Sequence, residues 1–168
     1  MQVNLEDKER LKNRKSSLIL LPIFANKHGY LNAGLQYYYH SLIFLDRKND
    51  TLSKILKELS KEKFMAFSTI AKTLLKFGIE PEFCLNPIEK SGYYDTSVIM
   101  YGGNDKKILL NDLTISSIIL ENLIKISKKA DNQEIKSIVV DLIEKEENCQ
   151  ETLKSQYENL NVKQKNLK

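Results

Sequence analysis

The sequence of 168 residues contains no tryptophan, two cysteines, three prolines and six glycines. Long segments rich in leucine and isoleucine, without glycine or proline, favour α-helices, because those two residues are the ones that a helix interior tolerates least. Two cysteines are too few for a disulfide framework, and we expect both thiols to be reduced in a cytoplasmic protein. Most of the glycines and prolines lie between residues 78 and 103, where the helical pattern is expected to stop.

The sequence also lacks a hydrophobic segment of the length that a membrane span requires, about 20 residues. The apolar run at residues 18–25 is far shorter, and the first 15 residues alternate charges instead of forming the apolar core of a signal peptide. Charge of one sign is not clustered either, since 26 basic and 22 acidic residues are distributed over every segment. A nucleic-acid-binding surface would gather lysine and arginine on one face. We therefore expect a soluble protein with neither a membrane nor a nucleic acid as partner.

A hydrophobic content of 42% over this length supports one domain with a single core. Residues 1–16 are highly charged and predict a mobile arm or a short extra helix. Residues 17–157 carry the apolar periodicity and predict the folded domain. Residues 158–168 are polar and basic, so we expect a disordered tail.

Apolar residues at helical spacing predict four helices, over residues 18–45, 51–77, 106–129 and 131–157. The first of these has an inner stripe at heptad spacing, made of Phe24, His28, Leu31, Leu35, Tyr38, Leu42 and Leu45. A neighbouring stripe widens its inner face, made of Tyr30, Gly34, Tyr37, Ser41 and Phe44. The two stripes together predict a helix that packs against two neighbours.

Capping residues set the expected helix ends. Pro22 falls in the first turn of the first helix, where its missing N–H is harmless. Thr51 is expected to cap the second helix and Gly78 to end it. Asp131 and Glu134 form a capping-box-like start for the fourth helix.

Residues 79–106 form a connection that is far longer than those usually found inside a compact domain. A four-helix bundle explains this length if the helix at 106–129 runs in the same direction as the helix at 51–77, because the chain must then travel the full length of the bundle before it starts again. The sequence therefore predicts an all-α, four-helix bundle with one long crossover connection.

Charged residues interrupt two of the inner stripes. Glu146 and Cys149 fall on the inner stripe of the helix at 131–157, and Lys63 falls on that of the helix at 51–77, with Ala66 beside it. A buried carboxylate without a partner is too costly to tolerate, so we expect Lys63 to face Glu146 and neutralise it. Two other interpretations remain open: Glu146 is an exposed residue beside Glu147, or Lys63 extends its amine to solvent.

Four phrases occur in one order and spacing that resembles a known family: LQYYYHSLIF (35–44), LLKFGIEPEF (74–83), GYYDTSVIMYGGN (92–104) and KILLNDLTISSII (107–119). They are similar to bacterial ferritin-like proteins related to rubrerythrins, spore-coat proteins and manganese catalases. In that family two helices each supply a glutamate, the other two each supply Glu-x-x-His, and these side chains hold two metal ions for peroxide or oxygen chemistry. The resemblance implies the ferritin-like fold and such a site.

Residue by residue, the ligand positions carry other side chains. The resemblance places them at Tyr30, Lys63, Ala66, Ser116, Glu146 and Cys149. Only Glu146 is retained, and the alignment of the helix at 106–129 leaves open that Asp112 or Glu121 replaces Ser116. One carboxylate and one thiol cannot compensate the lost hydration of two divalent ions, and the ammonium of Lys63 repels cations. We expect no bound metal, no other cofactor and no catalytic residue.

Two functions remain open. The first is a metal-free structural or interaction module, whose partner is a second copy or a relative of the same fold. The second is an iron- or manganese-dependent oxidoreductase or iron-handling protein with a rearranged site, which uses Glu146 and Cys149 with Asp112 or Glu121. The other candidate residues carry less weight. We interpret Cys149 as a small buried hydrophobic residue and His28 and His40 as packing or surface residues, and we expect the hydroxyls of Tyr30 and Tyr37 to bond Ser116 or Glu146.

Overall fold

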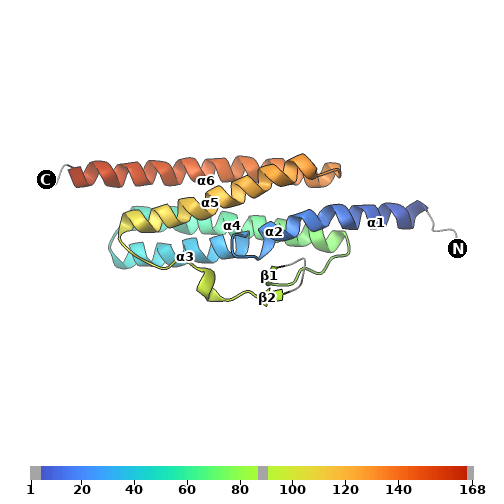
Figure 1. The fold of residues 1–168 in the computed structure, drawn as a ribbon. Coiled ribbons are helices and arrows are strands. Elements are labelled where there is room, and N and C mark those ends of the chain that lie inside the picture. Colours follow the sequence, from blue (N-terminus) through green and yellow to red (C-terminus); the bar gives the residue numbers. More distant parts are fainter. Residues whose placement is uncertain (1–4, 87–90, 166–168) are drawn as a thin grey trace.

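The computed structural model describes residues 5–86 and 91–165. Four long helices build the bundle: α3 (Tyr30–Asp46), α4 (Asp50–Lys76), α5 (Asp105–Lys129) and α6 (Gln133–Lys165). α3 packs along α4 and α5 packs along α6, so that the bundle consists of two helical hairpins laid against each other (Figure 1). Aliphatic side chains with no exposed surface fill the space between the hairpins, among them Leu56, Ile70, Ile115, Ile119 and Val139.

The crossover connects α4 to α5 along the outside of α3 (Figure 1). It contains a short antiparallel hairpin of β1 (Cys84–Asn86) and β2 (Ser91–Tyr93), with Cys84 opposite Tyr93, and a 3₁₀ turn, η2 (Thr96–Val98). Because the chain returns to the end of the bundle where α4 began, α5 runs parallel to α4 (Figure 1). The predicted four-helix bundle with a long crossover is confirmed.

Three short elements precede the bundle: α1 (Leu5–Ser17), η1 (Leu18–Leu20) and α2 (Leu21–Phe24). α1 forms the short extra helix that was one of the two expectations for the N-terminal residues. The side chain of Asn132, between α5 and α6, donates to Asn13 Oδ1 at 3.0 Å and so fastens α1 to the bundle. None of the helices in residues 5–86 and 91–165 is long and apolar enough to cross a membrane.

The single helix predicted for residues 18–45 is wrong, because the chain leaves the helical path between Phe24 and Tyr30. Gly29 makes this break: a Cβ atom there would lie 2.9 Å from the carbonyl oxygen of Phe24, so only glycine allows the backbone to approach so closely. The predicted heptad stripe fails with it. Its C-terminal members Tyr38, Leu42 and Leu45 are exposed, whereas the neighbouring stripe that contains Tyr30, Gly34, Tyr37, Ser41 and Phe44 is buried.

Two predicted caps are also wrong. Asn49 instead of Thr51 caps α4, by accepting a hydrogen bond from the Leu52 amide at 3.2 Å. At the start of α6, Asn132 instead of Asp131 accepts from the amides of Glu134 and Ile135, at 2.9 and 3.1 Å. In each case the neighbouring asparagine presents its side-chain oxygen to the first unpaired amides of the helix. The end of α4 is as predicted, with Gly78 in the left-handed region at a φ of 75°.

α6 continues to Lys165, past Tyr157, where the helix was expected to end and a disordered tail to begin. The half-buried side chains of Tyr157 and Leu160 pack against the core, and this contact explains why the polar segment stays helical. Residues 166–168 of the expected tail lie outside the described residues.

Candidate functional site

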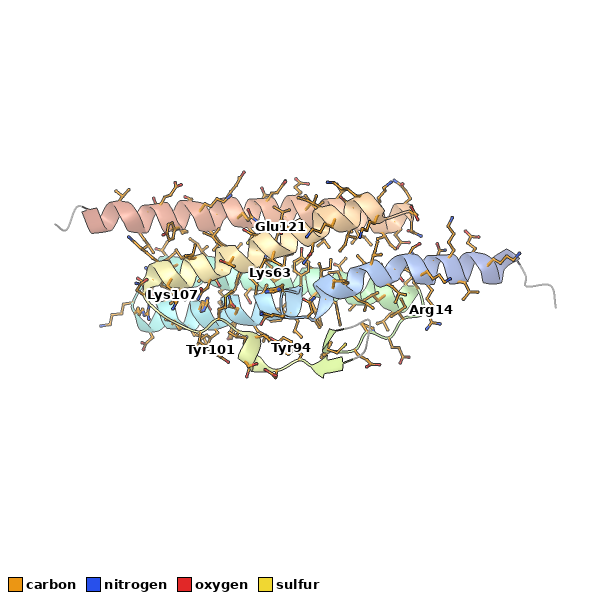
Figure 2. The ribbon with its side chains drawn as sticks, viewed as in Figure 1. Arg14, Lys63, Tyr94, Tyr101, Lys107 and Glu121 are labelled. Atoms are coloured by element: carbon orange, nitrogen blue, oxygen red, sulfur yellow. The ribbon has the colours of Figure 1, made fainter. Side chains whose placement is uncertain are left out.

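The centre of the bundle contains a buried ion pair between Lys63 of α4 and Glu146 of α6 (Figure 2 labels Lys63). The ammonium donates to both carboxylate oxygens, with distances of 2.6 Å from Nζ to Oε1 and to Oε2. The hydroxyl of Ser116, on α5, donates a further hydrogen bond to Oε1. The side chains of Lys63 and Glu146 are only 4% and 1% exposed, so both charges depend on the protein for their solvation.

Two tyrosine rings from α3 flank the ammonium. Lys63 Nζ lies 5.7 Å from the centroid of the Tyr30 ring and 5.6 Å from that of the Tyr37 ring, within the range of cation–π attraction. Burial alone would lower the pKa of Lys63, but the charge of Glu146 and its hydrogen bonds outweigh burial and raise that pKa above 10.5. The amine therefore stays protonated at neutral pH.

The two tyrosine hydroxyls have different surroundings. Tyr37 donates to the backbone carbonyl of Asp112 at 2.9 Å, so the expectation that it bonds Ser116 or Glu146 is wrong. The Tyr30 hydroxyl lies close enough to Glu146 for that carboxylate, after burial, to raise the pKa of Tyr30 well above 10. Among the described residues, however, this hydroxyl has no partner in hydrogen-bonding geometry.

Cys149 lies one turn beyond Glu146 on α6 and is 1% exposed. Its Sγ is 3.9 Å from the hydroxyl of Tyr37. Since that hydroxyl already gives its proton to Asp112, the thiol S–H is the donor in this contact. Burial raises the pKa of Cys149 above 9.0 and outweighs the opposing effect of the Lys63 ammonium. The thiol is therefore protonated and shielded, and it is a poor nucleophile and a poor metal ligand.

The donor set at this site does not fit a pair of divalent ions. The ammonium of Lys63 engages both oxygens of the Glu146 carboxylate, and its positive charge repels other cations. Ala66, one turn along α4 from Lys63, is buried and offers no donor atom. Within residues 5–86 and 91–165, no three histidine, cysteine, aspartate or glutamate side chains lie close enough together to hold a metal ion. The chemistry of the site is that of a closed ion pair.

A second buried polar cluster lies beside the first, between α3 and α5. His40 Nδ1 is 2.7 Å from Asp112 Oδ1, and Gln36 donates to the same oxygen at 2.9 Å. His40 Nε2 lies 2.9 Å from the carbonyl oxygen of Met100, and because a carbonyl can only accept, this nitrogen carries a proton. His40, Gln36 and Asp112 have no exposed surface. Burial raises the pKa of Asp112 above 3.8, against the opposing effects of His40 and Gln36.

This cluster fastens the crossover to α3. Gln36 accepts from the Met100 amide at 3.0 Å, and His40 bonds the carbonyl of the same residue. One turn before Gln36, Asn32 accepts from the hydroxyl of Tyr94 at 3.0 Å. This role of His40 differs from the packing or surface position that the sequence predicts for it. The available signal was the spacing of Asn32, Gln36 and His40, which places three polar side chains on one face of a helix.

Neither alternative ligand of α5 joins Glu146. The carboxylate of Asp112 is directed to His40 and Gln36, and its Oδ2 has no hydrogen-bond partner among the described residues. Glu121 is exposed on α5 (Figure 2). His28 is half-buried in the turn before α3. The structure thus brings Tyr30, Lys63, Ser116, Glu146 and Cys149 together and leaves Glu121 and His28 apart.

Comparisons with known proteins find a likeness in structure but none in sequence. No protein-family model matches the sequence. No curated protein sequence matches it either. Among solved structures, the chain is similar to two crystal structures of KatB, a manganese catalase from Anabaena, one described as wild type and one from Anabaena PCC7120. Each is 17% identical and matches over 89% of this chain and 74% of the other, with TM-scores of 0.78 and 0.80 respectively. At this identity the likeness concerns the fold, and the chain has the ferritin-like fold found in these manganese catalases.

Proposed function

We propose that this chain is a metal-free ferritin-like protein that serves as a structural or interaction module, with the Lys63–Glu146 ion pair in place of a metal centre. The observation that carries the proposal is the ammonium of Lys63, held by both oxygens of Glu146 in the middle of the bundle. A positive charge there supplies the neutralisation of the carboxylate that a metal ion would otherwise supply. The scaffold therefore stays closed without a cofactor.

The six positions that the resemblance assigns to ligands support this interpretation. Lys63, Glu146 and Ser116 share hydrogen bonds, Tyr30 places its ring against the ammonium, and Cys149 lies one turn from Glu146. Side chains that are far apart in the sequence thus fill one interior volume. This is what we expect if the side chains at former ligand positions now pack against one another. We assign these residues a structural role and no catalytic one.

The proposed interaction surface is the outward stripe of α3, made of Tyr38, Leu42 and Leu45. These side chains are 45%, 46% and 55% exposed, and their spacing of four and three residues is that of a helix seam that packs on another helix. Tyr39 and Tyr101 extend the apolar surface at its edge, with ring centroids 5.5 Å apart. A second copy of this chain is the occupant we propose, because a two-fold axis brings one such seam against its equivalent.

Metal analysis tests the absence of a cofactor. We expect protein that is purified without chelators, from cells supplied with iron, manganese and zinc, to contain only substoichiometric metal by plasma mass spectrometry and to show no peroxide turnover above buffer. The physical reason is the repulsion between Lys63 and any cation near Glu146. Stoichiometric metal would overturn the proposed function, and in that case a Lys63→Met variant, which lacks the repelling charge, would bind the metal at least as well as the native chain.

Light scattering tests the partner. We expect the native chain to be a dimer and the Leu42→Glu variant to be a monomer, because a charge in the seam would have to be desolvated without a partner. Leu75→Glu is the matched control: Leu75 is 55% exposed on α4, outside the stripe, and its substitution should leave the dimer intact. A native monomer at the same concentration, or equal dissociation of both variants, would contradict the assignment of this surface.

A further inference from the structure

A groove of about 940 Å³ opens at the end of the bundle where α1 lies, remote from the central ion pair. Its walls are α1 with η1 and α2, the segment that follows α4, and the C-terminal half of α5. Figure 2 labels Arg14, one of its lining residues, on α1 at this end of the molecule. The volume lies within the range of small-molecule sites, which are usually concave and mostly apolar.

Apolar and charged side chains both line the groove. Apolar lining comes from each wall, with Leu18 and Pro22 before α3, Ile79 and Pro81 after α4, and Ile126 on α5. Leu18 is 45% exposed, although its neighbours Leu20 and Leu21 are buried. An apolar chain laid in the groove would cover this surface, and its burial would provide the main driving force for binding.

Three cationic side chains line the same groove: Arg14 on α1 and Lys125 and Lys129, which are one turn apart on α5. Among the residues that the structure describes, none of the three takes part in an ion pair. The acidic lining residues, Glu80 and Glu82, belong to the other wall, in the segment after α4. Basic side chains therefore outnumber acidic ones in the lining by three to two, and Lys125 and Lys129 lie on a different element from Glu80 and Glu82.

From this arrangement we infer that the groove binds a single-chain amphiphile, an alkyl chain with an anionic head group such as a fatty-acid carboxylate. The alkyl chain lies against the apolar lining and the head group meets Lys125 and Lys129, which are one turn apart on α5. A neutral chain would gain only the burial, whereas a cationic head group would meet like charges at Lys125 and Lys129. The inference does not depend on the proposed function, because the groove shares no residue with the central ion pair.

Calorimetry with dodecanoate, below its micelle concentration, tests the inference on the native chain. We expect dodecanoate to bind more tightly than dodecan-1-ol, and dodecyltrimethylammonium not to bind. Octanoate should bind several-fold more weakly for each methylene that it lacks, since a buried methylene contributes about 0.8 kcal/mol. Equal binding of the acid and the alcohol, or binding only to vesicles of anionic phospholipid, would overturn the assignment.

Variants locate both ends of the ligand. The Lys125→Gln/Lys129→Gln variant should weaken dodecanoate binding about tenfold and leave dodecanol binding unchanged, whereas Lys128→Gln, on the same helix but outside the groove, should change neither. Asn122 lines the groove, so Asn122→Trp should abolish binding of both ligands; Ile124→Trp, at an exposed position of the same helix outside the lining, is its control. Circular dichroism confirms that each variant is folded. Unchanged affinity in Asn122→Trp, or an equal loss in Lys128→Gln, would show that the amphiphile binds elsewhere.

Discussion

Replacing Lys63 with methionine will lower the free energy of unfolding by about 3–5 kcal/mol, because it leaves the carboxylate of Glu146 buried with only the Ser116 hydroxyl to solvate it. Glu146→Leu should cost a similar amount, since it strands the ammonium between Tyr30 and Tyr37. The double variant Lys63→Met/Glu146→Leu should recover most of the loss. Two charges that are removed together leave nothing unpaired, and an apolar pair of similar size fills the same volume.

Urea unfolding of the four proteins measures this coupling. Lys61→Met is the matched control on the same helix, where Lys61 is 58% exposed and pairs with Glu58 at 2.6 Å. An exposed pair of this kind contributes about 0–1 kcal/mol, so the control should unfold close to the native chain. If Lys63→Met behaved like Lys61→Met, or if the double variant lost as much as the two single variants combined, the ion pair would not hold the centre of the bundle.

Removing Asp112 should have the second largest effect. Asp112→Leu leaves His40 Nδ1 and Gln36 Nε2 without their hydrogen-bond partner in a fully buried cluster, and we expect a loss of about 1–3 kcal/mol in the free energy of unfolding for each unpaired group. Because Gln36 and His40 also hold Met100, the crossover should loosen as well. Hydrogen exchange at the Met100 amide, which now bonds Gln36 at 3.0 Å, should therefore become faster.

The control for this variant is Asp141→Leu, at a carboxylate that is 58% exposed and pairs with Lys145 at 2.7 Å. Its free energy of unfolding should change by no more than about 1 kcal/mol. Adding His40→Leu to Asp112→Leu should not restore the stability fully, because it removes one unpaired group but also takes the donor from the Met100 carbonyl. An Asp112→Leu variant with the free energy of unfolding of the native chain would contradict the role given to this cluster. So would a destabilised variant without faster hydrogen exchange at the Met100 amide.

The sequence predicted the bundle well, because α4 and α5 have clear apolar stripes and because the long crossover admits few topologies. Lys63 and Glu146 could be identified as unusual since each interrupts an apolar stripe. The break at Gly29 could not be predicted, because the heptad pattern continues across it from Phe24 to Leu31. Only the contact of Gly29 with the Phe24 carbonyl, which depends on the fold, explains the turn.

The His40–Asp112 contact was missed for a different reason. The two residues are 72 positions apart, and neither helix alone shows which face meets the other. Both stripes of the helix at 18–45 were expected to face inward, and the stripe that contains Leu35, Leu42 and Leu45 was included because these residues are more hydrophobic than Ser41 and Tyr30. Hydrophobicity favoured the face that the structure leaves exposed, while the buried face contains polar groups that find partners on α5 and in the crossover.

Both buried clusters join the same two bodies, since Lys63 and His40 belong to the α3–α4 hairpin and Glu146 and Asp112 to the α5–α6 hairpin. Apolar contacts alone would allow one hairpin to slide along the other, because each leucine of a stripe contacts the facing helix about as well as the neighbouring leucine does. Buried polar side chains do not tolerate such sliding: a slip of one helical turn, about 5.4 Å, would separate the members of both pairs at once and leave their polar groups without partners in the interior. The two buried polar clusters therefore fix the alignment of the hairpins at two points. They select one relative position of the hairpins from the several that apolar packing alone would permit.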